Sequence, residues 1–417
     1  MHKGLERTLE LDARLMEVAG KVKVLSTLSW DEAECERFLE GWRKGKPKLP
    51  AVELAPTKVG AAVEELTAIA SACDFGDPLS AYVGRTARSY AMAARMLAAQ
   101  GTKTFTELSG ELYGQPRDFV GPGGLTNLDA AEHFVKATTD LAKSKTLAEE
   151  PATLSPAQVQ AELQKAMDLF FREHPVKVVL EPSLTAKAAA GADRIRIRSA
   201  SAFTPSDVPQ LLQHEGLVHT LTLKNGRLQP KVRSLGLGAP RTTPTQEGLA
   251  TLAELVTSTI DLSRLRRLAL RVLAIHQAMH GADFIQTFRF FLEAGQSEQE
   301  SYHSAQRIFR GGDVKGGSVF TKDGCYLWGL IATHTFLRKA IQEDKPHVVH
   351  ALFAGRLTLG DVVSLEPYFR SGVIVGPQYE PPWVQNRTCL AATLAFQVFT
   401  SQIDLAKLKL EDFQHTF

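Results

Sequence analysis

The sequence predicts an α+β protein that is mostly α-helical, with a small β-sheet and a helical N-terminal region. Three observations lead to this fold class. Apolar side chains recur at helical spacing, and Ala-rich segments are frequent, through about the first 150 residues. Short β-branched and alternating runs appear in a stretch that begins at Pro175. Helical patterns then return from Thr204 to about Ala340.

The N-terminal region is expected to consist of successive helices separated by short breaks. An approximate apolar stripe marks residues 9–18, and a Pro-containing basic stretch at 44–50 indicates a loop. The Ala-rich segment 58–99 is interrupted at 74–78, so we expect two helices there. Residues 126–171 supply two more helical segments.

Two short runs after Pro175 predict the sheet. Val176–Leu180 is β-branched, and Arg194–Arg198 alternates with period two, as a half-buried strand does. If the two runs pair directly, we expect an antiparallel ribbon. Ile195 and Ile197 would then share one face, and the arginines the other, which is most often a solvated face.

The remainder of the chain is expected to be helical, with two Gly-rich interruptions at Leu235–Gly238 and Arg310–Gly317. A segment rich in Pro, Gly and aromatic residues, 364–383, is expected to wrap over the surface before a last helix at about 387–403. We therefore divide the chain into a helical region, residues 1–174, and a second region, residues 175–417, that contains the candidate chemistry.

The composition excludes several classes of protein. The 48 Lys and Arg residues nearly balance the 46 Asp and Glu residues, so the net charge of +2 indicates neither nucleic acid nor a membrane as partner. No uncharged apolar run reaches the ~18 residues of a membrane helix, and the charged N-terminus lacks a secretion signal. The four scattered Cys residues show no CxxC spacing, which suits a reducing compartment. We expect a soluble cytoplasmic protein.

The most informative motif is His214-Glu215-Gly216-Leu-Val-His219, an HExxxH on a predicted helix. Zinc peptidases usually carry HExxH, which places two imidazoles on one helix face. With one more residue between them, His214 and His219 lie about 140° apart on a regular α-helix. A π-type bulge absorbs one extra residue and occurs often at functional sites, and Gly216 lowers the cost of the distortion. The two histidines could share one metal only through such a distortion, and Gly216 is a residue that would permit it.

A second segment supplies the missing ligand. Thr243-Pro-Thr-Gln246-Glu247 opens a predicted helix, with Thr243 as N-cap and Gln246 completing a capping box. Glu247 would lie in its first turn. Two imidazoles and one carboxylate leave a tetrahedral zinc ion with an open position for water, so the predicted metal ligands are His214, His219 and Glu247.

Two further carboxylates fit around this ligand set. Glu215, next to a ligand, is placed to act as the general base on the water. Glu254, two turns after Glu247, is placed to orient a ligating imidazole.

Competing interpretations remain open at this stage. A bare HExxxH arises by chance in some proteins, and a buried histidine on an apolar helix is more often a core residue. His276 and His280 have the i, i+4 spacing of a metal pair, but no acidic partner is evident for them.

A third region suggests a substrate clamp. Arg307 and Arg310 precede a Gly-rich turn, and Lys322 and Tyr326 follow it. Arginine forks and a lysine could hold a substrate carboxylate, and Tyr326 could donate to a developing oxyanion. The alternative is a basic surface loop without a function of this kind.

Taken together, these motifs resemble one known family. They are the HExxxH, Asn225–Pro230, Gln246–Ala250 (QEGLA), Arg307–Gly312 and Phe320–Asp323. The combination resembles the bacterial family named for its QEGLA motif and described as flavohaemoglobin expression-modulating, which is related to the microtubule-associated tyrosine carboxypeptidases of animals. The resemblance implies a zinc enzyme that acts on a protein C-terminus, with ligands at His214, His219 and Glu247 and a catalytic glutamate at Glu215. The segment before the QEGLA motif departs from the family pattern.

We therefore expect a zincin-like metallopeptidase core in residues 175–417, with Zn²⁺ as cofactor and a peptide or protein C-terminus as substrate. Glu215 and Tyr326 would be catalytic, and Arg307, Arg310 and Lys322 would bind substrate. The alternative is a regulatory or scaffold protein in which the zinc site is structural or vestigial. The two differ in Glu215, because a structural site needs no general base.

Overall fold

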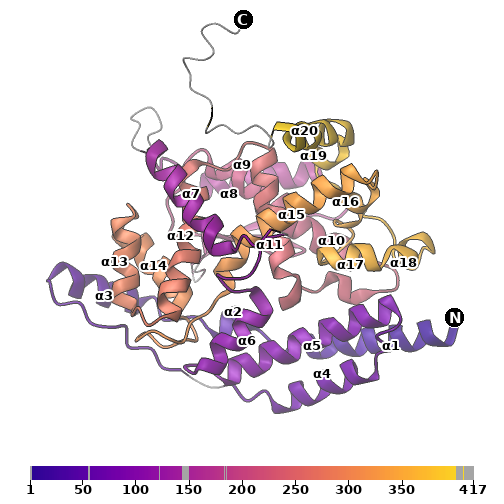
Figure 1. Cartoon of the computed structure of the whole chain (residues 1–417), viewed down its shortest axis with the longest axis horizontal. Helices are drawn as coiled ribbons and strands as arrows, with labels where there is room; N and C mark the ends of the chain where they lie inside the picture. Colours follow the sequence, from indigo (N-terminus) through magenta and orange to yellow (C-terminus); the bar gives the residue numbers. More distant parts are fainter. Residues whose placement is uncertain are drawn as a thin grey trace, which may run out of the picture.

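In a computed structural model the chain is mostly helical with one three-stranded sheet, which confirms the predicted α+β class. The structure describes residues 2–54, 57–121, 123–142, 150–182, 184, 186–400 and 407. Figure 1 shows α1, α4 and α5 side by side along one edge of the molecule, with α11 near its centre. No helix in these described ranges is both long and apolar enough to cross a bilayer.

The N-terminal half forms helices as predicted. Asp77 caps α5 by accepting from Ser80 N at 2.8 Å, and Pro78 occupies the first turn, so the break at 74–78 separates two helices. The helices in this half are α1 (His2–Ala19), α2 (Val24–Thr27), α3 (Ala33–Arg43), α4 (Gly60–Ala72), α5 (Pro78–Ala98), α6 (Lys103–Tyr113), α7 (Asn127–Ala142) and α8 (Pro156–Phe170).

The sheet contains β1 (Lys177–Glu181), β2 (Ala188–Ala190) and β3 (Arg194–Arg198) in the order β1-β3-β2. The two predicted runs do pair directly, but in parallel, so the antiparallel expectation was wrong. The reason is β2, which lies in the connection and pairs antiparallel with the other edge of β3, so that the chain direction reverses twice. Ile195 and Ile197 are fully buried, as the alternation predicted.

The second half is again helical. Its α-helices are α9 (Asp207–Leu211), α10 (Leu221–Arg227), α11 (Thr243–Val256), α12 (Leu262–Met279), α13 (Phe284–Glu293), α14 (Glu298–Phe309), α15 (Cys325–Gln342), α16 (His347–Ala351), α17 (Leu359–Ser364), α18 (Glu366–Arg370), α19 (Pro382–Gln385) and α20 (Arg387–Thr400). A π-helical segment, η2 (Leu212–Thr220), joins α9 to α10, and η3 (Arg233–Gly236), η4 (Pro240–Thr242) and η5 (Lys322–Gly324) are 3₁₀ turns. The last predicted helix is observed to Thr400; residues 401–403 lie outside the described part of the chain.

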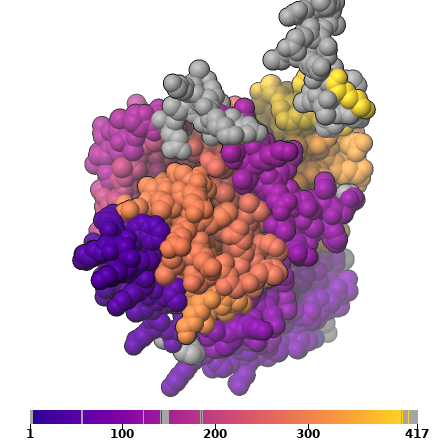
Figure 2. All heavy atoms as spheres, turned by 60° about the vertical axis from the view of Figure 1, so that its left-hand side comes forward, coloured from indigo at the N-terminus to yellow at the C-terminus, as the bar shows by residue number. Residues whose placement is uncertain are grey.

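Two large hydrophobic cores are found among the described residues, beside two smaller clusters. The larger core joins α1, α4 and α5 to the sheet, α11 and the C-terminal helices. The second is aromatic, and in it Phe38 of α3 packs edge-on against Phe284 and Phe288 of α13. Figure 2 shows this region from outside, where indigo atoms of the N-terminal part lie against orange atoms from later in the chain. Both cores draw residues from each side of residue 175, and the division into 1–174 and 175–417 stays a prediction.

Helices α11 and α15 touch through their backbones at two glycines. A Cβ atom on Gly248 would lie 2.2 Å from the backbone carbonyl of Gly329, and a Cβ on Gly329 would lie 2.2 Å from the carbonyl oxygen of Pro244. No side chain fits between atoms so close. This contact places Glu247 at the start of α11 against the first turns of α15, which contain Tyr326.

We predict that Gly248→Ala or Gly329→Ala will lower the free energy of unfolding by roughly 1–3 kcal/mol or more, because overpacking outweighs the helix preference of Ala. Urea denaturation measures this. Gly4→Ala, in α1 with nothing near its Cβ, is the matched control and should be close to neutral. Unchanged stability in both core variants would contradict the backbone contact.

Candidate metal centre

The HExxxH motif lies on the π-helical segment η2, which confirms the expected distortion. A π-helix bonds residue i to residue i+5, so residues five apart come together as residues four apart do in an α-helix. The rings of His214 and His219 are accordingly only 4.7 Å apart between centroids, at 86°. Gly216 packs closely on α8: a Cβ there would lie 2.7 Å from the methyl carbon of Met167.

Glu247 completes the cluster, as the sequence predicted. Its Oε2 lies 3.5 Å from His214 Nε2 and 3.3 Å from His219 Nε2. Within the described residues, these three form the one group of potential metal ligands found, and their ligand atoms all lie within 4.8 Å of one another. The side chains of all three residues are largely buried, with exposed fractions of 6% to 12%.

The spacing fits one ion. Metal–ligand bonds of about 2.0–2.1 Å in a tetrahedral arrangement imply ligand atoms about 3.4 Å apart. The observed 3.3 and 3.5 Å match that value. Two imidazole nitrogens and one carboxylate oxygen are therefore arranged so that a single divalent cation fits between them.

Glu254 orients His214, as predicted. Its Oε1 lies 2.6 Å from His214 Nδ1, which leaves Nε2 turned toward Glu247. Two further groups hold Glu254: the amide of Gln210 donates to Oε1 at 2.9 Å, and Arg264 Nη2 donates to it at 3.1 Å. Burial alone raises the pKa of Glu254, but Arg264 and His214 lower it to about 2, so the carboxylate is ionised at neutral pH.

The pKa shifts of the three residues indicate which proton a bound cation would displace. Burial alone lowers the pKa of His214, but its bonds to Glu247 and Glu254 raise it to about 9. Burial lowers the pKa of His219, whereas Lys322 and the imidazoles hold that of Glu247 well below its usual range despite burial. A proton on His214 thus lies between two carboxylates, and a divalent cation would displace it on binding.

Lys322 belongs to the metal cluster. Its Nζ donates to Glu247 Oε1 at 3.0 Å, while Oε2 of the same carboxylate faces the imidazoles. The ammonium predicted to clamp a substrate is therefore already paired with Glu247, a candidate metal ligand. This pairing leaves Glu247 one oxygen for a cation.

Glu215 and Tyr326 differ in their surroundings. Glu215 is half-buried, and no hydrogen bond or ion pair to it is found in the described ranges. Tyr326 is buried, with Lys322 Nζ 5.0 Å from its ring centre. Burial, and then the nearby Glu247, raise the pKa of Tyr326, so its hydroxyl keeps its proton at neutral pH.

Arg307 and Arg310 lie together but are held differently. Arg307 binds Asp323 with its Nε and Nη2, the latter at 2.8 Å, so that face of its fork is occupied. Arg310 is 8% exposed and stacks on Phe320 at 5.2 Å, and its Nε has no acceptor among the described residues. Both arginines line a shallow hollow, together with Leu25, Leu28, Ser29, Trp30 and Gln306.

The structure corrects the predicted capping box. Helix α11 follows directly from the turn η4, and its N-cap is Thr242, without a side-chain bond, instead of Thr243. The Gln246 side chain instead accepts from Thr222 Oγ1 at 3.0 Å and from Arg356 Nη1 at 2.8 Å. Because α11 continues directly from η4, Gln246 is not needed to cap the helix. Its side chain binds neighbouring elements instead.

The competing pair lies apart from any such ligand set. His280 Nδ1 is 2.7 Å from the backbone oxygen of His276, and no carboxylate joins the two rings in a ligand group within the described residues.

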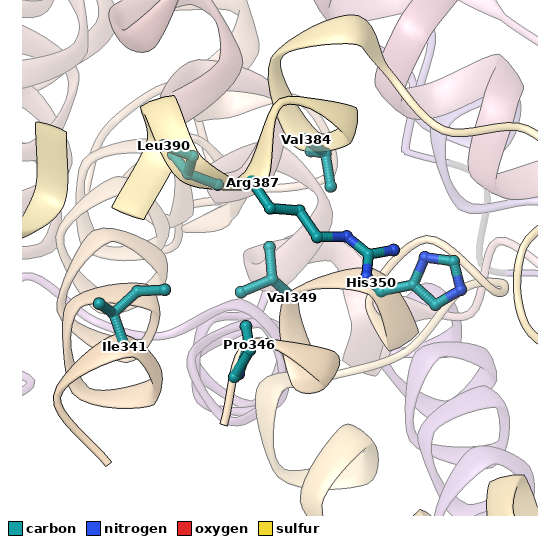
Figure 3. Close-up of a pocket in the computed structure, with 7 residues that line it drawn as sticks. All are labelled: Ile341, Pro346, Val349, His350, Val384, Arg387 and Leu390. Atoms are coloured by element: carbon teal, nitrogen blue, oxygen red, sulfur yellow. The ribbon is translucent and has the colours of Figure 1, made fainter. Parts of the chain in front are cut away.

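Another hollow, of about 250 Å³, lies at the C-terminal helices (Figure 3), where the guanidinium of Arg387 lies beside the ring of His350. Glu380 binds His350 Nδ1 at 2.6 Å and lies 3.9 Å from Arg387, so the two basic groups of this mostly apolar hollow already face a carboxylate.

Three residues around the centre escaped the sequence analysis. Arg264 holds Glu254, Asp323 holds Arg307, and Arg356 reaches Gln246 from 110 residues away in the chain. Asp323 ends the Phe320–Asp323 motif, which suggested no role for it, and Arg264 and Arg356 belong to none of the motifs. Only the fold brings them to the cluster.

The family described as "Microtubule-associated tyrosine carboxypeptidase" matches residues 36–402. The search of curated proteins gave no match.

We predict that His214→Ala will abolish tight binding of a divalent cation, and that Glu254→Gln will weaken it by roughly 10- to 100-fold because the imidazole loses its orienting carboxylate. Competition with a chelator measures both. His276→Ala is the control and should bind as the wild type does. If His276→Ala lost the cation and His214→Ala kept it, the assignment would be wrong.

Proposed function

The chain belongs to the microtubule-associated tyrosine carboxypeptidase family, and from this premise we propose that it is a zinc-dependent carboxypeptidase. The observation that supports the proposal most is the cluster of His214, His219 and Glu247 with Glu215 directly beside it. A structural metal site is usually closed by four protein ligands, whereas a catalytic zinc site has three and an open position. Three ligands are found in the described residues.

Zinc is the metal that the donor set favours. Two imidazoles with one carboxylate are the ligands of several zinc hydrolases, whereas Mg²⁺ and Ca²⁺ prefer oxygen ligands throughout. When bound, zinc supplies Lewis-acid polarisation and an activated water. We therefore propose a zincin-like core in which His214 and His219 stand one π-turn apart.

Glu215 is the proposed general base. It follows His214 directly on η2, is half-buried, and has no partner in the described ranges that would occupy its carboxylate. It would accept the proton of the attacking water and pass it to the leaving amine. Tyr326, with its proton retained, would donate a hydrogen bond to the oxygen of the scissile carbonyl.

Arg310 is the proposed partner of the substrate's C-terminal carboxylate. Arg307 is bound to Asp323 and Lys322 to Glu247, so among the three predicted clamp residues Arg310 has the least engaged charge. Trp30 also lines this hollow, and its indole Nε1 is a second buried donor without an acceptor in the described residues. Donors without acceptors favour an anion. Leu25 and Leu28 give the same hollow an apolar wall that suits a C-terminal side chain.

The proposed substrate is thus a peptide or protein with a free C-terminus. The name of the family points to a C-terminal tyrosine, which we adopt as the first candidate to test.

Glu215→Gln should reduce peptide hydrolysis by about 10²–10⁴-fold while zinc stays bound, because the side chain keeps its shape but no longer accepts a proton. Zinc content and hydrolysis of a peptide series that differs only in the last residue measure the two effects. Full activity in the variant would exclude Glu215 as base. A wild-type protein with bound zinc and no peptide cleavage would favour the regulatory alternative.

Arg310→Ala should raise KM by roughly 10- to 100-fold for peptides with a free C-terminus, because a charge-assisted bond is lost. The wild type should discriminate against amidated peptides, and the variant should discriminate much less. Arg289→Ala is the matched control, since Arg289 also stacks on a ring, that of Trp42, without lining the hollow. Equal effects of the two substitutions would contradict the assignment of Arg310.

A further inference from the structure

The Asn225–Pro230 segment takes no part in the proposed chemistry, yet its two amide side chains, Asn225 and Gln229, are buried and fully hydrogen-bonded. Asn225 Nδ2 donates to the carbonyl oxygens of Phe353 and Tyr379 at 2.8 and 2.7 Å. Gln229 Nε2 donates to those of Ala354 and Val375 at 3.0 and 2.9 Å. The end of α10 and the residues after it therefore hold the backbone around residues 353–379.

The segment held in this way carries Arg356. Its backbone N donates to Leu235 O at 2.8 Å, and its side chain is only 9% exposed. The guanidinium reaches two acceptors: Nη1 donates to Gln246 Oε1 at 2.8 Å, and Nη2 donates to the backbone oxygen of His219 at 3.2 Å. Gln246 precedes Glu247, so one planar fork joins η2, which carries His214 and His219, to α11, which carries Glu247.

The first of these elements needs external support. At the end of η2 the chain changes from π-helical to α-helical bonding, and side chains act on the carbonyl groups there. The hydroxyl of Thr222 lies 2.7 Å from Val218 O and 3.0 Å from Gln246 Oε1, but its single proton serves one acceptor at a time. Arg356 can donate to the π-segment and to Gln246 simultaneously.

We propose that Arg356 is a positioning residue that fixes the register between His219 and Glu247, and so sets how tightly the cluster binds a divalent metal ion. This goes beyond the proposed function in assigning the residue that holds the two ligand-bearing elements together. It rests on the same metal cluster.

A purely electrostatic role would have the opposite effect. A buried guanidinium near a cation site repels the cation, so removing its charge would tighten metal binding. If Arg356 acts by geometry, removing it loosens His219 against Glu247 and weakens metal binding. The sign of the change in metal affinity therefore separates the two roles.

The test is the zinc affinity of purified full-length protein, measured by chelator competition. Arg356→Met should weaken zinc binding by roughly 10- to 100-fold, as does loss of other groups that orient metal ligands. Arg356→Lys should lie between Arg356→Met and the wild type, because an ammonium on a flexible chain holds the two acceptors less rigidly than a fork. Arg241→Met is the matched control: Arg241 is a largely buried arginine that binds Asp361 at 2.7 Å, and its loss should lower stability without changing zinc affinity.

If Arg356→Met fails to fold, Gln246→Leu removes the acceptor instead and should weaken zinc binding by roughly tenfold. Wild-type or tighter zinc affinity in a folded Arg356→Met or Gln246→Leu protein would overturn the inference and leave the proposed function standing. A wild-type protein that binds no zinc would overturn both.

Discussion

The wide turn between His214 and His219 is the constraint on which the rest of the site depends. With five residues from one histidine to the other, a regular α-helix would point the imidazoles apart, and only the π-helical segment η2 brings them within 4.7 Å. Glu247 then has to meet them from another helix. The backbone contact between Gly248 and Gly329 fixes where that helix lies against α15.

Buried charges around the cluster are arranged in pairs. Lys322 faces Glu247, Arg264 faces Glu254, and Arg307 faces Asp323, so each buried carboxylate has a cation beside it. Burial of an unpaired charge is costly, and removal of one partner from such a pair is strongly destabilising. The pairing keeps the ligand carboxylate ionised and limits how it turns. Arg310 has no such carboxylate partner in the described residues, which suits an incoming anion.

Local patterns in the sequence predicted much of this arrangement. The HExxxH spacing indicated that the two histidines could share a metal only through a distortion such as a π-bulge, and helical spacing placed Glu254 where it could orient an imidazole. The structure has a π-helical segment there, and Glu254 contacts His214. Interactions between distant segments were not predictable in the same way. The parallel pairing of β1 with β3 depends on where β2 lies, and the role of Gln246 depends on Arg356, which is remote in the chain. The sequence likewise could not tell whether Lys322 would contact the substrate or Glu247. The packing of α11 against η5 and α15 places it beside Glu247.

The most direct test of the central claim is a crystal structure of the zinc-loaded protein with anomalous diffraction at the zinc edge. The account predicts one strong peak about 2.0–2.2 Å from His214 Nε2, His219 Nε2 and Glu247 Oε2, with Lys322 still bound to the other oxygen of Glu247. A peak between His276 and His280, or a zinc ion that leaves Glu247 unligated, would contradict it.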